Sequence, residues 1–317
     1  MTALGVTWSG PFRGLKVRLF DKQGKAGAWR KISPACPCGK DGAPAVKKAS
    51  NLSTALLPAH DSFAYQFDID DGVEVVDAIA IDASSTSPSA GDDESKAPPF
   101  SDGGAGDLQF PPPGLITRAK WGADESKRFT GDGKESSPPE FFPMQAMMVH
   151  HTATPNDDGS DPAETVRAIY EQHAVANDWG DIGYNFLIDR KGRIYEGRFS
   201  GKKGIAAHDE KGQVVTGFHT AGFNSGTIGI AMLGDFNAGV MSADMRKALV
   251  GLLASLAKKH GIDPSSVFEY RNPLSGKRKL GPTVGGHKDW FPTECPGTST
   301  YADLEAIRTD VGKLRAS

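Results

Sequence analysis

Residues 227–233 read Thr-Ile-Gly-Ile-Ala-Met-Leu, an apolar run in which small and large side chains alternate. This alternation is typical of a central strand in a sheet. Residues 145–150 form a second short apolar run, Gln-Ala-Met-Met-Val-His, which leads into the histidine pair His150 and His151. We predict that this run is a buried strand that holds a histidine rigidly at the edge of the sheet. Two more strands are predicted over residues 185–190 and 193–198.

Helical signals surround these strands. Asp161 is a helix-capping residue, and the apolar periodicity after it predicts a helix that carries His173. Ser242 is expected to cap a second helix that ends at Gly261, and a third helix is expected after Gly297. Strands interleaved with helices predict an α/β domain, with a mixed central sheet flanked by helices.

The first part of the chain has a different character. Short, nearly alternating apolar runs at residues 15–20, 63–67 and 73–76 predict a small antiparallel β unit with one wet face. Serine, proline, glycine and acidic residues dominate from residue 84 to 114, a composition that favours an extended linker. The predicted organisation is a β-rich accessory domain (1–83), a linker (84–114) and the α/β domain (115–317).

Composition and charge exclude several classes of protein. The apolar fraction is 38% and the charged fraction is 24%, values of ordinary globular chains. A net charge of −3 lacks the broad positive footprint of proteins that bind nucleic acid or anionic membranes. No stretch approaches the roughly 20 apolar residues that span a bilayer. We therefore expect no nucleic-acid partner and no membrane insertion, and we see no leader of an exported protein in residues 1–4.

The cysteines and histidines point to a metal. Cys36 and Cys38 are interpreted as loop thiols rather than half of a metal site, because no second Cys or His pair accompanies them. His287 and Cys295 are joined by a proline-containing loop that can fold back, so both can reach one point. Imidazole together with thiolate selects Zn²⁺. The third ligand is expected from the histidine pair that ends the 145–150 strand, and spacing does not choose between its members.

Two histidines and one cysteine leave the fourth tetrahedral position open, as catalytic zinc requires. Several further blocks occur in one order along the chain. They read RAKWGA (118–123), MVHHTA (148–153), DIGYNF (181–186), YEGR (195–198), HTAGFN (219–224), TIGI (227–230), and GHKD through CPG (286–297). Together they resemble the peptidoglycan recognition protein and type 2 N-acetylmuramoyl-L-alanine amidase family over about residues 115–315.

The resemblance implies a zinc hydrolase that cuts the amide between the lactyl group of N-acetylmuramic acid and L-alanine of the stem peptide. It implies His150, His287 and Cys295 as the ligands, with His151 as a neighbour. Tyr184 stands at the position of a donor to the oxyanion, and the alternative for it is an ordinary core tyrosine. Thr293 stands where some members have a lysine, and it can donate a hydrogen bond without supplying a positive charge.

The remaining family positions imply a groove for the muramyl-peptide. The resemblance places His173, Trp179, His219 and Asn224 there, and for His219 the alternative is a hydrogen bond that stabilises its loop. Trp179 matches one member of a Gly-Trp pair that in the family indicates diaminopimelate-type stems, whereas Asp178 departs from it.

The sequence leaves three functions open. The first is a secreted or envelope-located, monomeric zinc amidase that acts on peptidoglycan muropeptides through activated water. The second is a non-catalytic peptidoglycan-binding receptor on the same fold, and Cys295 favours the enzyme because receptors of the family usually lack this ligand. The third is a scaffold in which the metal is structural, with a closed fourth coordination position.

Overall fold

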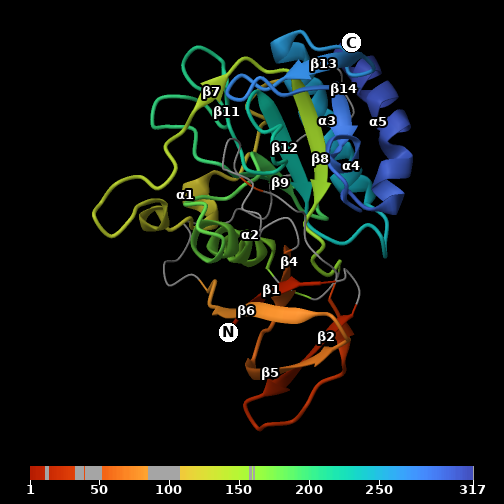
Figure 1. Cartoon of the computed structure of the whole chain (residues 1–317). Coiled ribbons are helices and arrows are strands. Elements are labelled where there is room, and N and C mark those ends of the chain that lie inside the picture. The colour runs from red at the N-terminus through yellow and green to blue at the C-terminus, as the bar shows by residue number, and fades with distance from the viewer. Residues whose placement is uncertain are drawn as a thin grey trace.

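The computed structural model describes residues 1–10, 14–32, 39, 52–84, 108–156, 159 and 161–316. They form an α/β region built on a mixed sheet and an N-terminal β-rich unit, as predicted (Figure 1). Cys36, Cys38 and residues 85–107 of the predicted linker lie outside the described residues. Within the described part of the chain, no helix has the length and apolar character needed to cross a membrane.

The central sheet has five strands in the order β10-β9-β12-β8-β15. The predicted central strand, β12, lies in the middle and runs parallel to both β8 and β9. β15 continues the sheet in parallel beside β8, and β10 pairs antiparallel with β9. The bounds are β8 (Ala146–His151), β9 (Phe186–Ile188), β10 (Ile194–Glu196), β12 (Thr227–Met232) and β15 (Val284–Gly286).

The alternation of small and large residues along β12 reflects its two different faces. Ile228 and Ile230 are fully buried in a core cluster with α3 (Ala243–His260) and α5 (Thr298–Ala316), which cover one face of the sheet (Figure 1). Burying an isoleucine contributes roughly 1.5–3 kcal/mol. Ala231 points to the other face, where a second cluster includes residues of α2 (Pro162–Glu171).

The helix boundaries follow the capping residues that the sequence predicted. The Asp161 side chain accepts a hydrogen bond from the backbone N–H of Ala163 at the start of α2. The Ser242 side chain does the same for Met245 in α3, and Gly261 ends α3 with a left-handed φ of 66°. His173 lies beyond α2 in a π-helical turn, Gln172–Ala176. Shorter elements are α1 (Arg118–Trp121), a 3₁₀ turn (Glu125–Arg128), α4 (His287–Trp290), β7 (Phe141–Phe142), β11 (Val214–Val215), β13 (Val267–Arg271) and β14 (Arg278–Pro282).

The N-terminal unit consists of two antiparallel sheets, β4-β1-β6 and β3-β2-β5. A shared core cluster includes Leu4, Trp8 and Val17. Three strands of this unit were not predicted, namely β1, β3 and β4. The bounds are β1 (Ala3–Ser9), β2 (Leu15–Asp21), β3 (Arg30–Lys31), β4 (Leu52–Pro58), β5 (Ser62–Ile69) and β6 (Glu74–Ile81).

The sheet β4-β1-β6 also packs against α2. Ala3, Leu56 and Ile81 share a buried cluster with Val166 and Ile169 of the helix.

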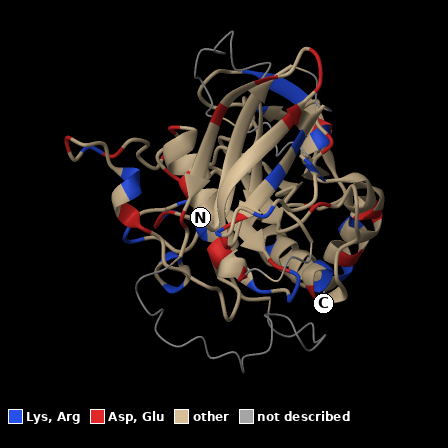
Figure 2. Ribbon diagram, turned by 90° about the horizontal axis from the view of Figure 1, so that it is seen from below, with Lys and Arg blue, Asp and Glu red and all other residues tan. Residues whose placement is uncertain are grey.

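Basic and acidic residues are interspersed over the ribbon when the molecule is viewed from below (Figure 2). The division into separate domains at residues 83 and 115 stays a prediction, and within the predicted linker Leu108 and Phe110 pack partly buried against the α/β core.

Candidate metal centre

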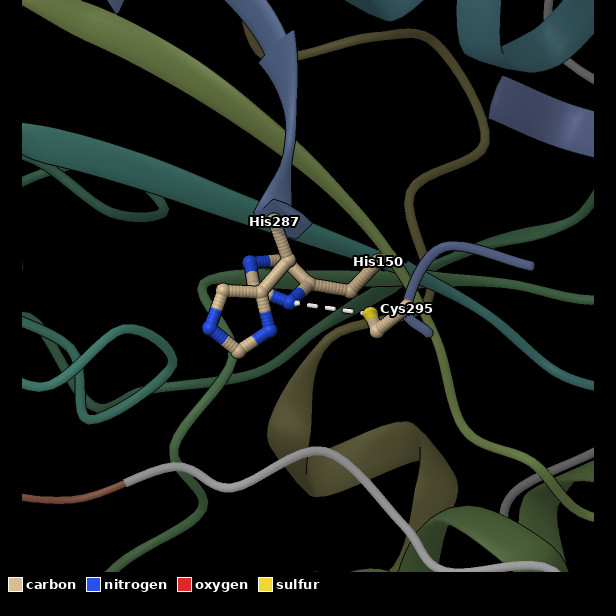
Figure 3. Close-up of side chains that lie close together, drawn as sticks. All are labelled: His150, His287 and Cys295. Carbon is tan, nitrogen blue, oxygen red and sulfur yellow. Dashed lines mark hydrogen bonds between the residues drawn. The ribbon is translucent and has the colours of Figure 1, made fainter. Parts of the chain in front are cut away.

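Neighbouring parallel strands bring two of the predicted ligands together. β8 and β15 pair in register with Val149 opposite Gly286, so the residues that follow, His150 and His287, lie side by side. Cys295 comes from the loop between α4 and α5 and meets them there. Figure 3 shows the three side chains converging. The fold therefore assembles residues that are far apart in sequence.

The donor atoms are spaced as a small ion requires. One nitrogen of each histidine and the sulfur of Cys295 lie within 4.8 Å of one another, and all three residues are buried. Cys295 Sγ lies 3.6 Å from His150 Nδ1. In tetrahedral zinc, Zn–S and Zn–N bonds of about 2.3 and 2.0 Å separate the two donors by about 3.5 Å. The donor set thus fits zinc in both chemistry and spacing.

A hydrogen bond orients the His150 ring. Its Nε2 lies 3.1 Å from Nδ1 of His219. When Nε2–H of His150 donates to His219, its Nδ1 keeps the lone pair that faces Cys295. Metal-ligating histidines almost always donate their second ring N–H in this way. With His219 as the acceptor, His150 has the tautomer that a metal ligand needs.

Burial keeps the imidazoles neutral. It holds the pKa of His150 well below its ordinary value, and the nearby imidazole of His287 lowers that pKa further. The pKa of His287 is likewise lowered, first by burial and then by His219 and His151. A metal binds the neutral form of imidazole, so this environment suits ligation.

Backbone hydrogen bonds position the sulfur. The N–H of His151 donates to Cys295 Sγ at 3.4 Å and so holds the sulfur beside the end of β8. The N–H of Cys295 donates to Thr293 Oγ1 at 3.2 Å, and the N–H of Lys288 donates to the Cys295 carbonyl at 3.0 Å. Thr293 is half-buried, and it acts on the centre indirectly, through its hydrogen bond to the backbone of this loop.

The side chain of His151 turns away from the cluster because consecutive residues of a strand face opposite sides. Its Nδ1 accepts the N–H of Phe236 at 3.2 Å and lies 3.7 Å from a carboxylate oxygen of Asp235. Burial lowers the pKa of His151 to about 4, although Asp235 acts to raise it. The structure thus groups His150, rather than His151, with His287 and Cys295.

Tyr184, His173 and Trp179 form one side of the centre. Tyr184 is 2% exposed, and its ring centroid lies 5.5 Å from those of His150 and His173. The His173 ring lies 4.7 Å from the ring of Trp179, which is half-buried. His173 Nδ1 accepts the N–H of Gly183 at 3.1 Å, so a neutral ring carries its proton on Nε2. Burial lowers the pKa of His173 to about 3.

His219 and Asn224 are fully buried. Asn224 Oδ1 accepts the N–H of Thr220 at 2.7 Å, and Nδ1 of His219 lies 3.1 Å from Thr220 Oγ1. These hydrogen bonds match the alternative of a loop-stabilising role for His219. Direct contact of His219 and Asn224 with substrate stays a prediction.

Two neighbours of the site were not identified as site residues from sequence. The Asn224 amide donates to the carbonyl of Gly39 at 2.7 Å, and the N–H of Gly39 donates to the Phe218 carbonyl at 2.9 Å. Arg198 is 2% exposed and lies over the Phe218 ring, 4.2 Å from its centroid. Arg198 belongs to the YEGR block (195–198) of the family resemblance, but no role for it was inferred from the sequence. Nothing in the pattern around Gly39 signals its contact.

Comparison with known proteins gives the chain its family. Residues 140–298 match the family model described as N-acetylmuramoyl-L-alanine amidase. Peptidoglycan-recognition protein 2 of Holotrichia diomphalia is 27% identical over 199 residues, which are 62% of this chain and 86% of that protein. An N-acetylmuramoyl-L-alanine amidase of Homo sapiens is 27% identical over 194 residues, 60% of this chain and 27% of that protein.

Among solved structures, wild-type Drosophila PGRP-LB matches with a TM-score of 0.44 at 27% identity, covering 61% of this chain and 92% of that one. The family model spans the residues that carry the candidate metal centre, from β8 to the first residue of α5. This chain therefore belongs to the N-acetylmuramoyl-L-alanine amidase family, whose members among its sequence relatives include peptidoglycan-recognition proteins.

Proposed function

We propose that the chain is a zinc-dependent N-acetylmuramoyl-L-alanine amidase that hydrolyses the lactyl–L-alanine amide of peptidoglycan. The observation that carries the proposal is the buried cluster of His150, His287 and Cys295, whose donor atoms lie within 4.8 Å of one another. These three residues would hold the ion. When bound, zinc supplies a Lewis acid that polarises a carbonyl and lowers the pKa of water from 15.7 to about 7.

The surrounding residues have separate tasks in this proposal. His219 holds His150 in the ligating tautomer, and Thr293 fixes the backbone of the cysteine loop. Tyr184, beside His150, would donate its phenolic O–H to the oxyanion that develops when the amide is attacked. His173 and Trp179 would orient the muramyl-peptide, with the Nε2–H of His173 as a donor. Because this substrate lies outside the cytoplasmic membrane, we expect a secreted or envelope-located protein, and we propose that it acts as a monomer.

The alternative is a peptidoglycan-binding receptor on the same fold, a function suggested by the names of several relatives. The placement of Cys295 favours the enzyme. A receptor needs polar and aromatic contacts to its ligand but has no need for a cysteine sulfur converging with two neutral imidazoles. A scaffold with a structural metal would need a fourth protein ligand, and among the described residues the cluster comprises three.

Digestion of purified peptidoglycan, followed by mass analysis of the products, tests the proposal. The protein as isolated should release stem peptides that begin with a free L-alanine amine. Chelation should stop the release and added Zn²⁺ should restore it. The matched control is His60→Ala, because His60 is exposed in the N-terminal unit. Binding without any release, or release at a different bond, would contradict the proposal.

A further inference from the structure

The outer face of sheet β3-β2-β5 displays a set of aligned polar and aromatic side chains. Alternation along β2 puts Lys16, Arg18 and Phe20 on this face, while the residues between them fill the core of the unit. Arg18 lies opposite Gln66 of β5, and directly opposed residues share a face. Trp29 precedes β3 on the other side of β2 and is 41% exposed.

Contacts fix these side chains in place. The guanidinium carbon of Arg18 lies 4.7 Å from the ring centroid of Trp29 and 5.4 Å from that of Phe20. Arg18 Nε and Nη2 both donate to Gln66 Oε1, at 2.8 and 2.6 Å. A single exposed apolar residue is ordinary, but a tryptophan held against an ordered guanidinium is a preorganised contact surface. Tryptophan and arginine are also the residues that most often dominate binding energy at interfaces.

The charges on this face suit a polymer with widely spaced anionic groups. Lys16 pairs with Asp68 at 2.8 Å, whereas Arg18 donates to a neutral amide. Lys31 is exposed and lies in register with Lys16, so positive charge exceeds negative charge here. A polyphosphate chain needs a denser array of lysine and arginine, and the net charge of the whole protein is −3.

We propose that this face binds the glycan strand of peptidoglycan, a surface separate from the metal centre. An aromatic ring offers a flat apolar surface for the C–H face of a sugar ring, and Trp29 supplies it. Arg18 and Gln66 carry N–H donors for sugar hydroxyls. Arg18 and Lys31 attract the carboxylates that accompany the glycan. This inference rests on the proposed function, which makes the same polymer the substrate.

The position of the face makes the two contacts compatible. β2 and β5 lie at the opposite end of the molecule from β8 and β12 (Figure 1). The sheet β4-β1-β6 and α2 pack against each other between these two ends. When one long polymer engages both surfaces, the first contact raises the effective concentration of the second. A short soluble muropeptide reaches the metal centre alone.

The test measures by sedimentation how tightly the wild type and each variant bind to insoluble, phosphate-free peptidoglycan. Chelator is present so that no bond is cut. The variants are Trp29→Ala and Lys31→Glu in the full chain. The matched control is Tyr65→Ala, which removes a ring that is 37% exposed but lies opposite Leu19, whose side chain faces the core, and so is on the other side of the sheet. Thermal unfolding of each variant separates lost binding from lost folding.

Trp29→Ala should weaken binding at least tenfold, which corresponds to about 1.4 kcal/mol. Lys31→Glu should weaken it with a reduced dependence on salt, and Tyr65→Ala should leave it unchanged. Hydrolysis of a small soluble muropeptide should be equal in all folded variants. Wild-type affinity in both face variants would overturn the inference, and so would binding that requires phosphate-containing wall polymers. If no amide is cut but Trp29→Ala still loses binding, the proposed function fails while this surface stands.

Discussion

A pair of stacked histidines away from the metal centre should make the stability of the fold depend on pH. His208 Nε2 lies 2.8 Å from His260 Nε2, and the two rings stack with centroids 5.0 Å apart at 13°. His208 Nδ1 lies 2.8 Å from the Ala206 carbonyl, so Nδ1–H donates to it and Nε2 accepts from His260. Both rings are neutral in this arrangement. The pair joins the 204–208 loop to the end of α3.

The free energy follows from the pKa values. Burial lowers the pKa of His208 from 6.5 to about 4. The charge of Lys259 lowers this pKa a little further, whereas the Ala206 carbonyl and Asp209 raise it. Burial also lowers the pKa of His260 to about 4, helped by His208 and Lys259. A shift of about 2.5 units corresponds to about 3 kcal/mol. Because His260 is partly exposed and the rings titrate as a pair, we expect about 3 kcal/mol for both together.

The sign of the pH dependence is set by which state, folded or unfolded, takes up protons at the higher pH. The unfolded chain protonates near pH 6.5 and the folded chain near pH 4, so this contribution is complete above pH 6.5 and is lost as the pH falls towards 4. The assay is urea unfolding of the wild type and His208→Phe at pH 7.5 and 4.5. Phenylalanine keeps the packing against Phe110, whose ring centroid lies 4.8 Å from that of His208, but cannot titrate.

His208→Phe should lose about 2 kcal/mol less stability than the wild type between these two pH values. Comparing the two proteins at the same metal content cancels the pH dependence of the metal centre, which the substitution does not touch. An identical loss in His208→Phe and the wild type would refute the reasoning.

Three further substitutions probe the centre and the contact between the N-terminal unit and α2. Cys295→Ala should abolish zinc binding and turnover while the circular dichroism of the fold persists, and a normal zinc content in this variant would exclude the sulfur as a ligand. Tyr184→Phe should lower kcat on the order of 10²-fold at unchanged zinc content, whereas an unaltered kcat would leave the ring a packing role. Arg167 donates to the carbonyls of Ala83 and Trp121 at 2.6 and 2.9 Å, so Arg167→Ala should lower the free energy of unfolding by about 1–3 kcal/mol. A urea midpoint equal to that of the wild type would show that these hydrogen bonds contribute no net stability.

Local patterns in the sequence predicted the parts of the fold that depend on neighbouring residues. The alternation in β12, the caps of α2 and α3 and the strand before His150 were all visible as periodicity or as a capping residue. The convergence of His287 and Cys295 could be inferred because one short loop joins them. The choice of His150 over His151 needed the family resemblance, since the direction of each side chain depends on which face of the sheet meets the helices.

Other features depend on contacts that no local pattern encodes. β1 is buried against β2 on one side and α2 on the other, so its residues 3–9 lack the alternation of a strand with one wet face. The hydrogen bond between His150 and His219 joins two segments that are distant in sequence, and the same is true of Gly39 and Asn224. Such pairs become visible after the chain is folded, because their geometry is set by the packing of whole elements.

X-ray absorption at the zinc edge of the metal-loaded protein tests the central claim most directly. If His150, His287 and Cys295 hold the ion, the spectrum should fit two nitrogens at about 2.0 Å, one sulfur at about 2.3 Å and one further light atom supplied by solvent. Cys295→Ala should remove the sulfur contribution. A wild-type spectrum without sulfur, or one that requires a second sulfur, would contradict the account.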